Sequence, residues 1–77
     1  MKEFLQFLAR QLVKNPNEVD VRETSGDIVS MLELRVAEED VGRVIGRQGE
    51  TAHSLRIILN AVAARNNRKV HLEIIDR

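Results

Sequence analysis

The chain has no cysteine and only two aromatic residues, Phe4 and Phe7. The missing cysteine excludes disulfides and thiolate metal sites. So few aromatic side chains argue against nucleic-acid recognition by stacking on an aromatic platform. No apolar run approaches the ~20 residues of a membrane-spanning helix, and the N-terminus lacks the segments of a signal peptide. We therefore expect a cytoplasmic protein with no membrane-spanning segment.

Charge is balanced over the whole chain but unevenly distributed along it. The formal net charge is zero. Residues 1–40 carry five basic and nine acidic side chains, whereas residues 41–69 carry six basic side chains against Glu50 alone. Positive charge collected in one segment is the arrangement that attracts a polyanion.

The hydrophobic pattern predicts one small domain, residues 1–77, of the α+β class. Its 77 residues are 43% apolar and 31% charged, as in a globular protein. Helical periodicity alternates with two-residue periodicity in the order α-β-β-α-α-β, so we expect a three-stranded sheet with helices packed on one face. The expected elements are helices at 2–13, 38–46 and 50–66, the last capped by Asn66-Asn67, and strands at 18–24, 28–36 and 69–76.

The most informative segment is Val41 to Gly49, directly before the longest helical pattern. Gly46 and Gly49 flank Arg47 and Gln48, which leaves the backbone bare next to the first N–H groups of a helix. Such a place allows phosphate oxygens to approach closely. A plain turn between two helices would also use glycine in this way. The cation within the turn and the apolar pair before it favour a binding loop.

The run from Asp40 to Gly49, followed by Thr51, resembles the V-I-G-x-x-G signature of KH RNA-binding domains. The element order is similar to the type II form of that fold, and a domain of this length resembles the small bacterial KhpA family. The resemblance covers essentially the whole chain. It implies a non-catalytic protein whose GXXG loop clamps about four nucleotides of single-stranded RNA. It further implies a post-transcriptional regulator or RNA chaperone.

Mapped onto this sequence, the resemblance gives a set of RNA-binding residues. The glycines would admit the phosphates, Arg47 and Gln48 would donate hydrogen bonds, and the apolar pair would line a groove whose far wall is strand 28–36. The expected RNA-binding residues are Arg43, Val44, Ile45, Gly46, Arg47, Gln48 and Gly49.

The long helix carries a second apolar face. We expect the stripe formed by Ala52, Leu55, Leu59 and Val62, with Ile58 near it, to face the sheet. A second stripe of Ile57, Ala61 and Ala64 would then contact a partner or widen the core face. The resemblance implies pairing through this helix, as a homodimer or with a larger RNA-binding protein of the KhpB/Jag (EloR) type.

Other sites have little support in the sequence. His53 and His71 lack a third ligand at metal spacing, and no serine has a base nearby in the sequence pattern. We therefore expect no metal, no cofactor and no catalysis. Two alternatives remain: an assembly subunit whose long helix docks a protein with little RNA affinity, and a ribosomal component, which the zero net charge disfavours.

Overall fold

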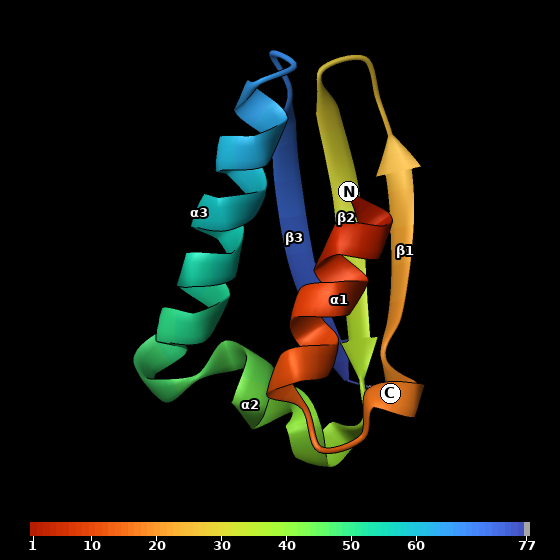
Figure 1. The fold of residues 1–77 in the computed structure, drawn as a ribbon, viewed down its shortest axis with the longest axis vertical. Helices are drawn as coiled ribbons and strands as arrows, with labels where there is room; N and C mark the ends of the chain where they lie inside the picture. The colour runs from red at the N-terminus through yellow and green to blue at the C-terminus, as the bar shows by residue number, and fades with distance from the viewer. Residues whose placement is uncertain (77) are drawn as a thin grey trace.

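The computed structural model describes residues 1–76, so Arg77, the last residue of the expected domain, lies outside the described part (Figure 1). The element order is the expected α-β-β-α-α-β. A short 3-10 turn precedes β1, α2 and α3, and these turns are η1 (Pro16–Glu18), η2 (Glu38–Asp40) and η3 (Arg47–Gly49). The helices are α1 (Lys2–Leu12), α2 (Val41–Ile45) and α3 (Glu50–Ala64), and the strands are β1 (Asp20–Ser25), β2 (Val29–Val36) and β3 (Lys69–Asp76).

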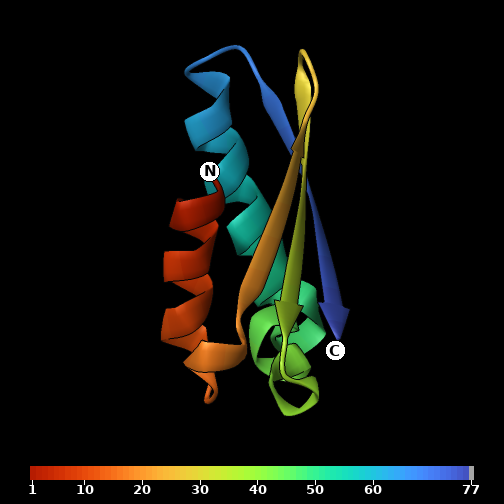
Figure 2. The same ribbon diagram turned by 90° about the vertical axis from the view of Figure 1, so that its right-hand side faces the viewer.

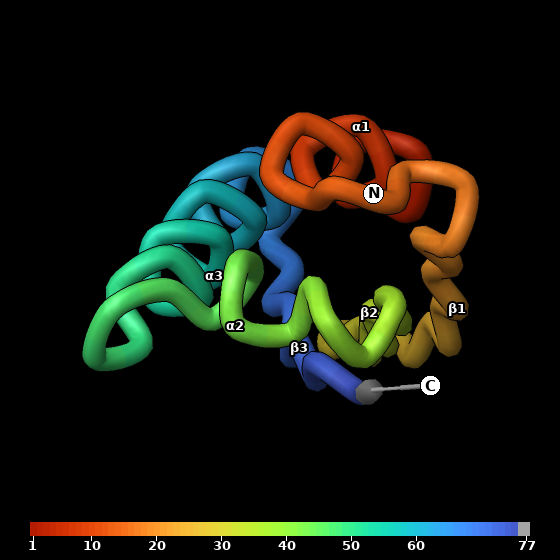
Figure 3. Tube along the Cα trace, turned by 90° about the horizontal axis from the view of Figure 1, so that it is seen from below, coloured from red at the N-terminus to blue at the C-terminus, as the bar shows by residue number. Residues whose placement is uncertain are grey.

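The three strands form one mixed sheet in the order β1-β2-β3. The first pair is antiparallel, with Val21 opposite Leu34, and the second is parallel, with Leu32 beside Leu72. Helices α1 and α3 cover the same face of this sheet, and α2 lies at one end of it (Figures 2 and 3). The α+β prediction with helices on one face is confirmed.

Turn residues explain where the strands begin. A Cβ atom at Gly26 would lie 2.8 Å from the carbonyl oxygen of Val29, so only glycine fits this hairpin turn. The amide of Gly26 donates to that same oxygen at 2.9 Å. Ile28 belongs to the turn and is 61% exposed, so the strand predicted at 28–36 begins one residue later, at Val29.

The core is built from alternate strand residues and one stripe of each long helix. Burying a leucine or valine side chain contributes roughly 1.5–3 kcal/mol, and small domains depend on a handful of such residues. The buried cluster consists of Leu5, Ala9, Val19, Val21, Leu32, Leu34, Val36, Val44, Leu55, Leu59, Ala63, Val70 and Leu72.

The buried face of α3 differs from the expected stripe. Ala63 is buried, whereas Val62 is 38% and Ile58 is 41% exposed, so the predicted core positions of these two residues are wrong. With ~3.6 residues per turn, the four-residue step from Leu59 to Ala63 advances ~40°, whereas the three-residue step to Val62 falls ~60° to the other side. The first side is buried in the core, and the second is partly exposed.

The end of α3 is fixed to the hairpin turn. Asn67 has the left-handed conformation expected of a C-terminal cap, with φ 57°. Arg68 follows and donates to the carbonyl oxygen of Gly26 at 2.9 Å and to the hydroxyl of the buried Ser30 at 2.7 Å. These contacts hold the far end of α3 against the sheet.

Within residues 1–76, the structure contains no helix long and apolar enough to cross a membrane. The cytoplasmic location stays a prediction.

Candidate nucleic-acid interface

The loop between α2 and α3 has a backbone that few residues besides glycine adopt. Gly46 and Gly49 both have φ 77°, and Gln48 between them has φ 55°. The amide of Gly46 closes α2 by donating to the carbonyl oxygen of Gly42 at 2.9 Å, and that of Gly49 donates back to Gly46 at 3.2 Å. Three positive φ angles in four residues turn the chain sharply between the two helices.

Of the three glycines in this region, two are required by the structure, each for a different reason. A Cβ atom at Gly46 would collide with the side chain of Thr51 and lie 2.8 Å from its amide nitrogen. Gly49 has open space around it, so only its positive φ excludes a side chain. Gly42 has neither constraint, because nothing lies within 4 Å of the Cβ position and its φ is an ordinary helical one.

The tip of the loop is exposed and free of side-chain contacts. Arg47 and Gln48 are exposed, and neither side chain forms a hydrogen bond or ion pair with another residue in the described part of the chain. Helix α3 starts immediately afterwards with Gly49 as its N-cap and no side-chain capping bond. Backbone N–H groups, a helix N-terminus and an unpaired cation therefore share one small exposed surface, which suits an anion.

Of the apolar pair before the loop, only one member can touch a ligand. Ile45 is 38% exposed beside the loop, but Val44 is fully buried in the core. The predicted role of Val44 in lining a groove is wrong. Its neighbour on the short helix α2 must face away from the core, because adjacent helical positions point about 100° apart.

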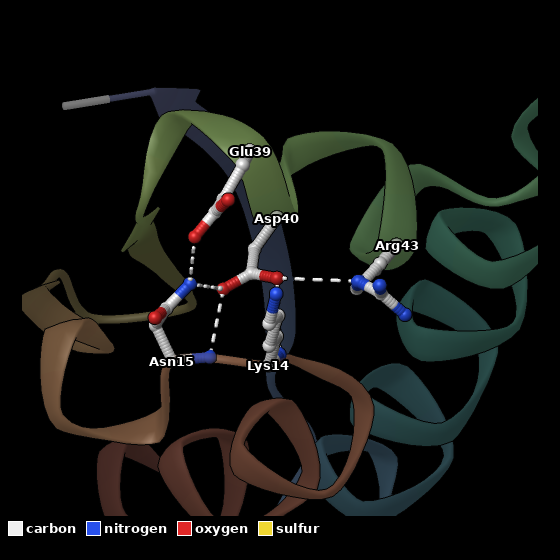
Figure 4. Close-up of polar contacts among 5 residues, drawn as sticks. All are labelled: Lys14, Asn15, Glu39, Asp40 and Arg43. Carbon is white, nitrogen blue, oxygen red and sulfur yellow. Dashed lines mark hydrogen bonds and ion pairs between the residues drawn. The ribbon is translucent and has the colours of Figure 1, made fainter.

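Arg43 is fixed by an acidic residue whose structural role the sequence did not reveal. The carboxylate of Asp40 is completely buried, and its Oδ1 pairs with Nε of Arg43 at 3.3 Å (Figure 4). It accepts hydrogen bonds from the backbone amides of Lys14 and Asn15, both at 3.0 Å, and from the side-chain amide of Asn15 at 3.0 Å. Asp40 thus ties the segment after α1 to the start of α2.

Burial alone would raise the pKa of the Asp40 carboxyl. The hydrogen bonds from Lys14 and Asn15, together with the positive charge of Arg43, outweigh burial and lower the pKa below its ordinary value of 3.8. The group is therefore ionised at neutral pH and holds Arg43 by charge as well as by geometry.

The strand beside α2 and α3 is β3, not the predicted strand 28–36. Strand β2 is the middle strand and has neighbours on both sides, whereas β3 has one free edge and is contacted by both helices. The prediction that strand 28–36 forms the far wall is therefore wrong.

Backbone direction identifies which β3 groups face the free edge. The amide of Lys69 donates to the Ile28 carbonyl, on the β2 side, at 2.9 Å. Alternate residues in a parallel ladder point their peptide groups to opposite edges, so those of Val70, Leu72 and Ile74 face outward.

Part of this free edge is covered by polar side chains of α3. The amide side chain of Asn60 accepts from the backbone N–H of Val70 at 2.9 Å and donates to its carbonyl oxygen at 3.1 Å. Arg56 donates to the Leu72 carbonyl oxygen at 3.2 Å. An asparagine inside a helix is a weak helix former, and this was the only signal in the sequence for such a contact.

The predicted partner surface of α3 is solvent-exposed. Ile57 is 56% exposed, and Ala61 and Ala64 are exposed on the same helix. Ile58 and Val62, which were predicted to face the core but are exposed, add to this apolar surface. A groove of about 250 Å³ lies between α1 and α3 and is lined mainly by apolar side chains, among them Leu8, Leu12 and Ile58.

No group of three or more potential metal ligands occurs among residues 1–76. His53 and His71 are both exposed and lie on α3 and β3. Three exposed surfaces remain as candidate binding sites. They are the Gly46–Gly49 loop, the uncovered part of the β3 edge and the apolar face of α3.

Comparison with known proteins agrees with this geometry. Residues 2–74 match the family model described as "KhpA/KhpB, KH domain". The "RNA-binding protein KhpA" of Clostridium acetobutylicum is 45% identical over 75 residues, which cover 97% of this chain and 100% of that protein. The protein of the same name from Chlamydia caviae is 43% identical over 76 residues, which cover 99% and 97%.

A third similar protein, the "RNA-binding protein KhpA" of Treponema pallidum, is 45% identical over 75 residues, which cover 97% of this chain and 94% of that protein. No solved structure matches. The matched region includes every element that forms the loop, the edge of β3 and the exposed face of α3, and the chain belongs to the KhpA/KhpB family of KH domains.

Proposed function

We propose that this chain is a single KH domain that binds single-stranded RNA through the Gly46–Gly49 loop and the neighbouring edge of β3. The observation that carries the proposal is the unpaired Arg47 at the tip of a loop held in positive φ by two glycines. The relatives at 43–45% identity are named RNA-binding proteins, and the family is non-catalytic.

In this arrangement both the backbone and the side chains of the loop contact the phosphates of the RNA. Phosphate oxygens approach the bare backbone at Gly46 and Gly49, and Arg47 and Gln48 donate hydrogen bonds to them. Arg43 adds a second cation, held in place by Asp40. The bases then lie over Ile45 and against the free edge of β3, where unpaired peptide groups can hydrogen-bond to their Watson–Crick edges.

The exposed face of α3 supports a second part of the proposal. Ile57, Ala61 and Ala64 pair with the same helix of a second copy, or with a KhpB/Jag-type protein, and the domain acts as a post-transcriptional regulator or RNA chaperone. Apolar side chains this exposed on a helix of so small a domain gain free energy when a partner covers them.

RNA binding is tested by fluorescence anisotropy with labelled single-stranded RNA at two salt concentrations. Wild-type protein should bind with a log–log salt slope of about −2 to −3, as expected for three or four phosphate contacts. The double substitution Arg47→Asp/Gln48→Asp should abolish binding, since it replaces the donors by anions. Aspartate tolerates the positive φ at position 48, so the circular dichroism melt should not change.

The matched control is Arg65→Asp/Asn66→Asp at the opposite end of α3. Both residues are exposed, and the change in charge is the same. This control should weaken binding only slightly. An equal loss in both variants would show that net charge rather than the loop is responsible, and would contradict the proposal.

The alternative function is an assembly subunit that docks a protein through α3 and has little RNA affinity. The exposed Ile57 and its neighbours favour it. Ile57→Asp or Ala61→Asp should convert a dimer to a monomer in light scattering, with RNA binding retained per chain. A wild-type mass equal to that of the monomer would exclude the homodimer, and binding to a KhpB-type protein would then be measured.

A further inference from the structure

Side chains of α3 form hydrogen bonds with outward-facing peptide groups along the free edge of β3. The side-chain amide of Asn60 makes both hydrogen bonds to Val70 that a neighbouring strand would make, and Arg56 occupies the carbonyl oxygen of Leu72. Asn60 also donates to the carbonyl oxygen of Arg56 at 3.0 Å, which links the two contacts.

The spacing of these contacts follows from helix and strand geometry. Four residues along a helix advance ~6 Å, and two residues along a strand advance ~6.6 Å. Positions 60, 56 and 52 of α3 therefore step past Val70, Leu72 and Ile74 of the antiparallel-running β3. The third position is Ala52, which has no hydrogen-bonding group.

The row of contacts consequently stops in the middle of the strand. Within the described chain, the N–H of Leu72 and both peptide groups of Ile74 that face outward have no hydrogen-bond partner. This open window lies toward the C-terminal end of β3, where α2 is placed (Figure 1). At Leu72 the window is asymmetric, because the carbonyl is occupied and the N–H is not.

We infer that Arg56 is a specificity-determining residue of this domain and disfavours adenine at the base that contacts Leu72. The inference rests on the proposed RNA-binding function. Arg56 is exposed and uses one of its five N–H donors on Leu72. A base at this point therefore meets the N–H of Leu72 and the remaining N–H groups of Arg56, which are all donors.

At Leu72 the free groups only donate, because the free carbonyl of Ile74 lies two residues further along the strand. Such a place selects a base edge with adjacent acceptors. Cytosine offers N3 and O2 on its Watson–Crick edge, and guanine offers O6 and N7 on its Hoogsteen edge. Adenine places its N6 amino donor beside its ring acceptor on both edges. That amino group needs an acceptor, and the Leu72 carbonyl oxygen already accepts from Arg56. Only its second lone pair remains, beside the cationic guanidinium, which disfavours a further donor there.

The test compares oligo(C) with oligo(A) of equal length in anisotropy titrations of the full chain. Wild-type protein should prefer oligo(C) by about tenfold, the ratio expected from one unmatched hydrogen bond. In Arg56→Ala the Leu72 carbonyl becomes available, so the ratio should fall to about twofold or less. Arg65→Ala removes the same charge from the exposed end of α3 and should keep the wild-type ratio.

Each outcome decides the matter. No preference in wild type, or an unchanged ratio in Arg56→Ala, would overturn the role of Arg56 while leaving RNA binding intact. An equal fall in Arg65→Ala would assign the preference to charge and would also overturn it. If the wild-type protein bound neither oligonucleotide nor any other single-stranded RNA, the proposed function would fail, and this inference with it.

Discussion

The two ends of α2 are built in opposite ways. At its start, the buried carboxylate of Asp40 is saturated by Lys14, Asn15 and Arg43, which fixes the helix to a segment about 25 residues away. At its end, the chain runs through Gly46 into a loop whose exposed side chains have no partners within residues 1–76. A helix that is tied down at one end can hold a bare loop at the other in a defined position.

The same contrast holds within β3. Its first half is closed by Asn60 and Arg56, while the half nearer α2 is open. The open parts of the loop and of the strand thus both lie next to α2, which contacts the loop segment and β3. Preorganisation of this kind lowers the entropy lost when a flexible single strand binds.

Of the substitutions around α2, Gly46→Ala should have the largest effect, because it disturbs the loop at the end of the helix. The new Cβ would collide with Thr51, and alanine at φ 77° with an extended ψ has a strained backbone. We expect the free energy of unfolding to fall by about 2–4 kcal/mol in a urea titration. A loss below about 1 kcal/mol would mean that Thr51 moves away easily, and the loop would then not be rigidly held.

The next largest effect should come from Asp40→Asn, and it should depend on pH. Because the folded-state pKa of Asp40 is lowered, its carboxylate stabilises the fold above the unfolded-state value of 3.8, and this contribution is lost as the pH falls through the lower folded-state pKa. The urea midpoint of wild type should exceed that of Asp40→Asn clearly at pH 7, and the difference should shrink as the pH falls below 3.8.

The control for this titration is Glu38→Gln, which removes an exposed charge two residues away. It should follow the wild-type curve at every pH. A wild-type minus Asp40→Asn difference that stays constant down to about pH 2 would show that shape rather than charge holds the start of α2.

Features of the fold and the site that depend on residues close together in the sequence could be predicted, and those that depend on distant residues could not. Helix and strand positions depend on periodicity and turn residues, so the element order and the glycine loop followed from the sequence. The orientation of Val44 did not, because two adjacent apolar residues on a five-residue helix give no measure of which one faces the core.

The remaining errors concern contacts between distant segments. The order of strands in a sheet depends on contacts between distant residues. The sequence therefore led us to assign the far wall of the groove to strand 28–36, whereas β3 lies at that position. The partners of Asp40 are 25 and 26 residues away, and its carboxylate therefore resembled an ordinary charge in the first turn of a helix. The amide contacts of Asn60 with Val70 were hidden for the same reason.

The smallest expected effect belongs to Gly42→Ala, which lies between the two contrasting ends of α2. Nothing would contact the added methyl group, and alanine in a helix loses less conformational entropy on folding than glycine does. We expect the free energy of unfolding to rise by about 0.5–1 kcal/mol in the same urea titration. RNA affinity should change less than about twofold, because the phosphates are assigned to Gly46 and Gly49. A stabilised protein that binds RNA much more weakly would show instead that the ligand approaches α2 along its side, and the bound strand would then extend from the open end of the helix toward the end that Asp40 fixes.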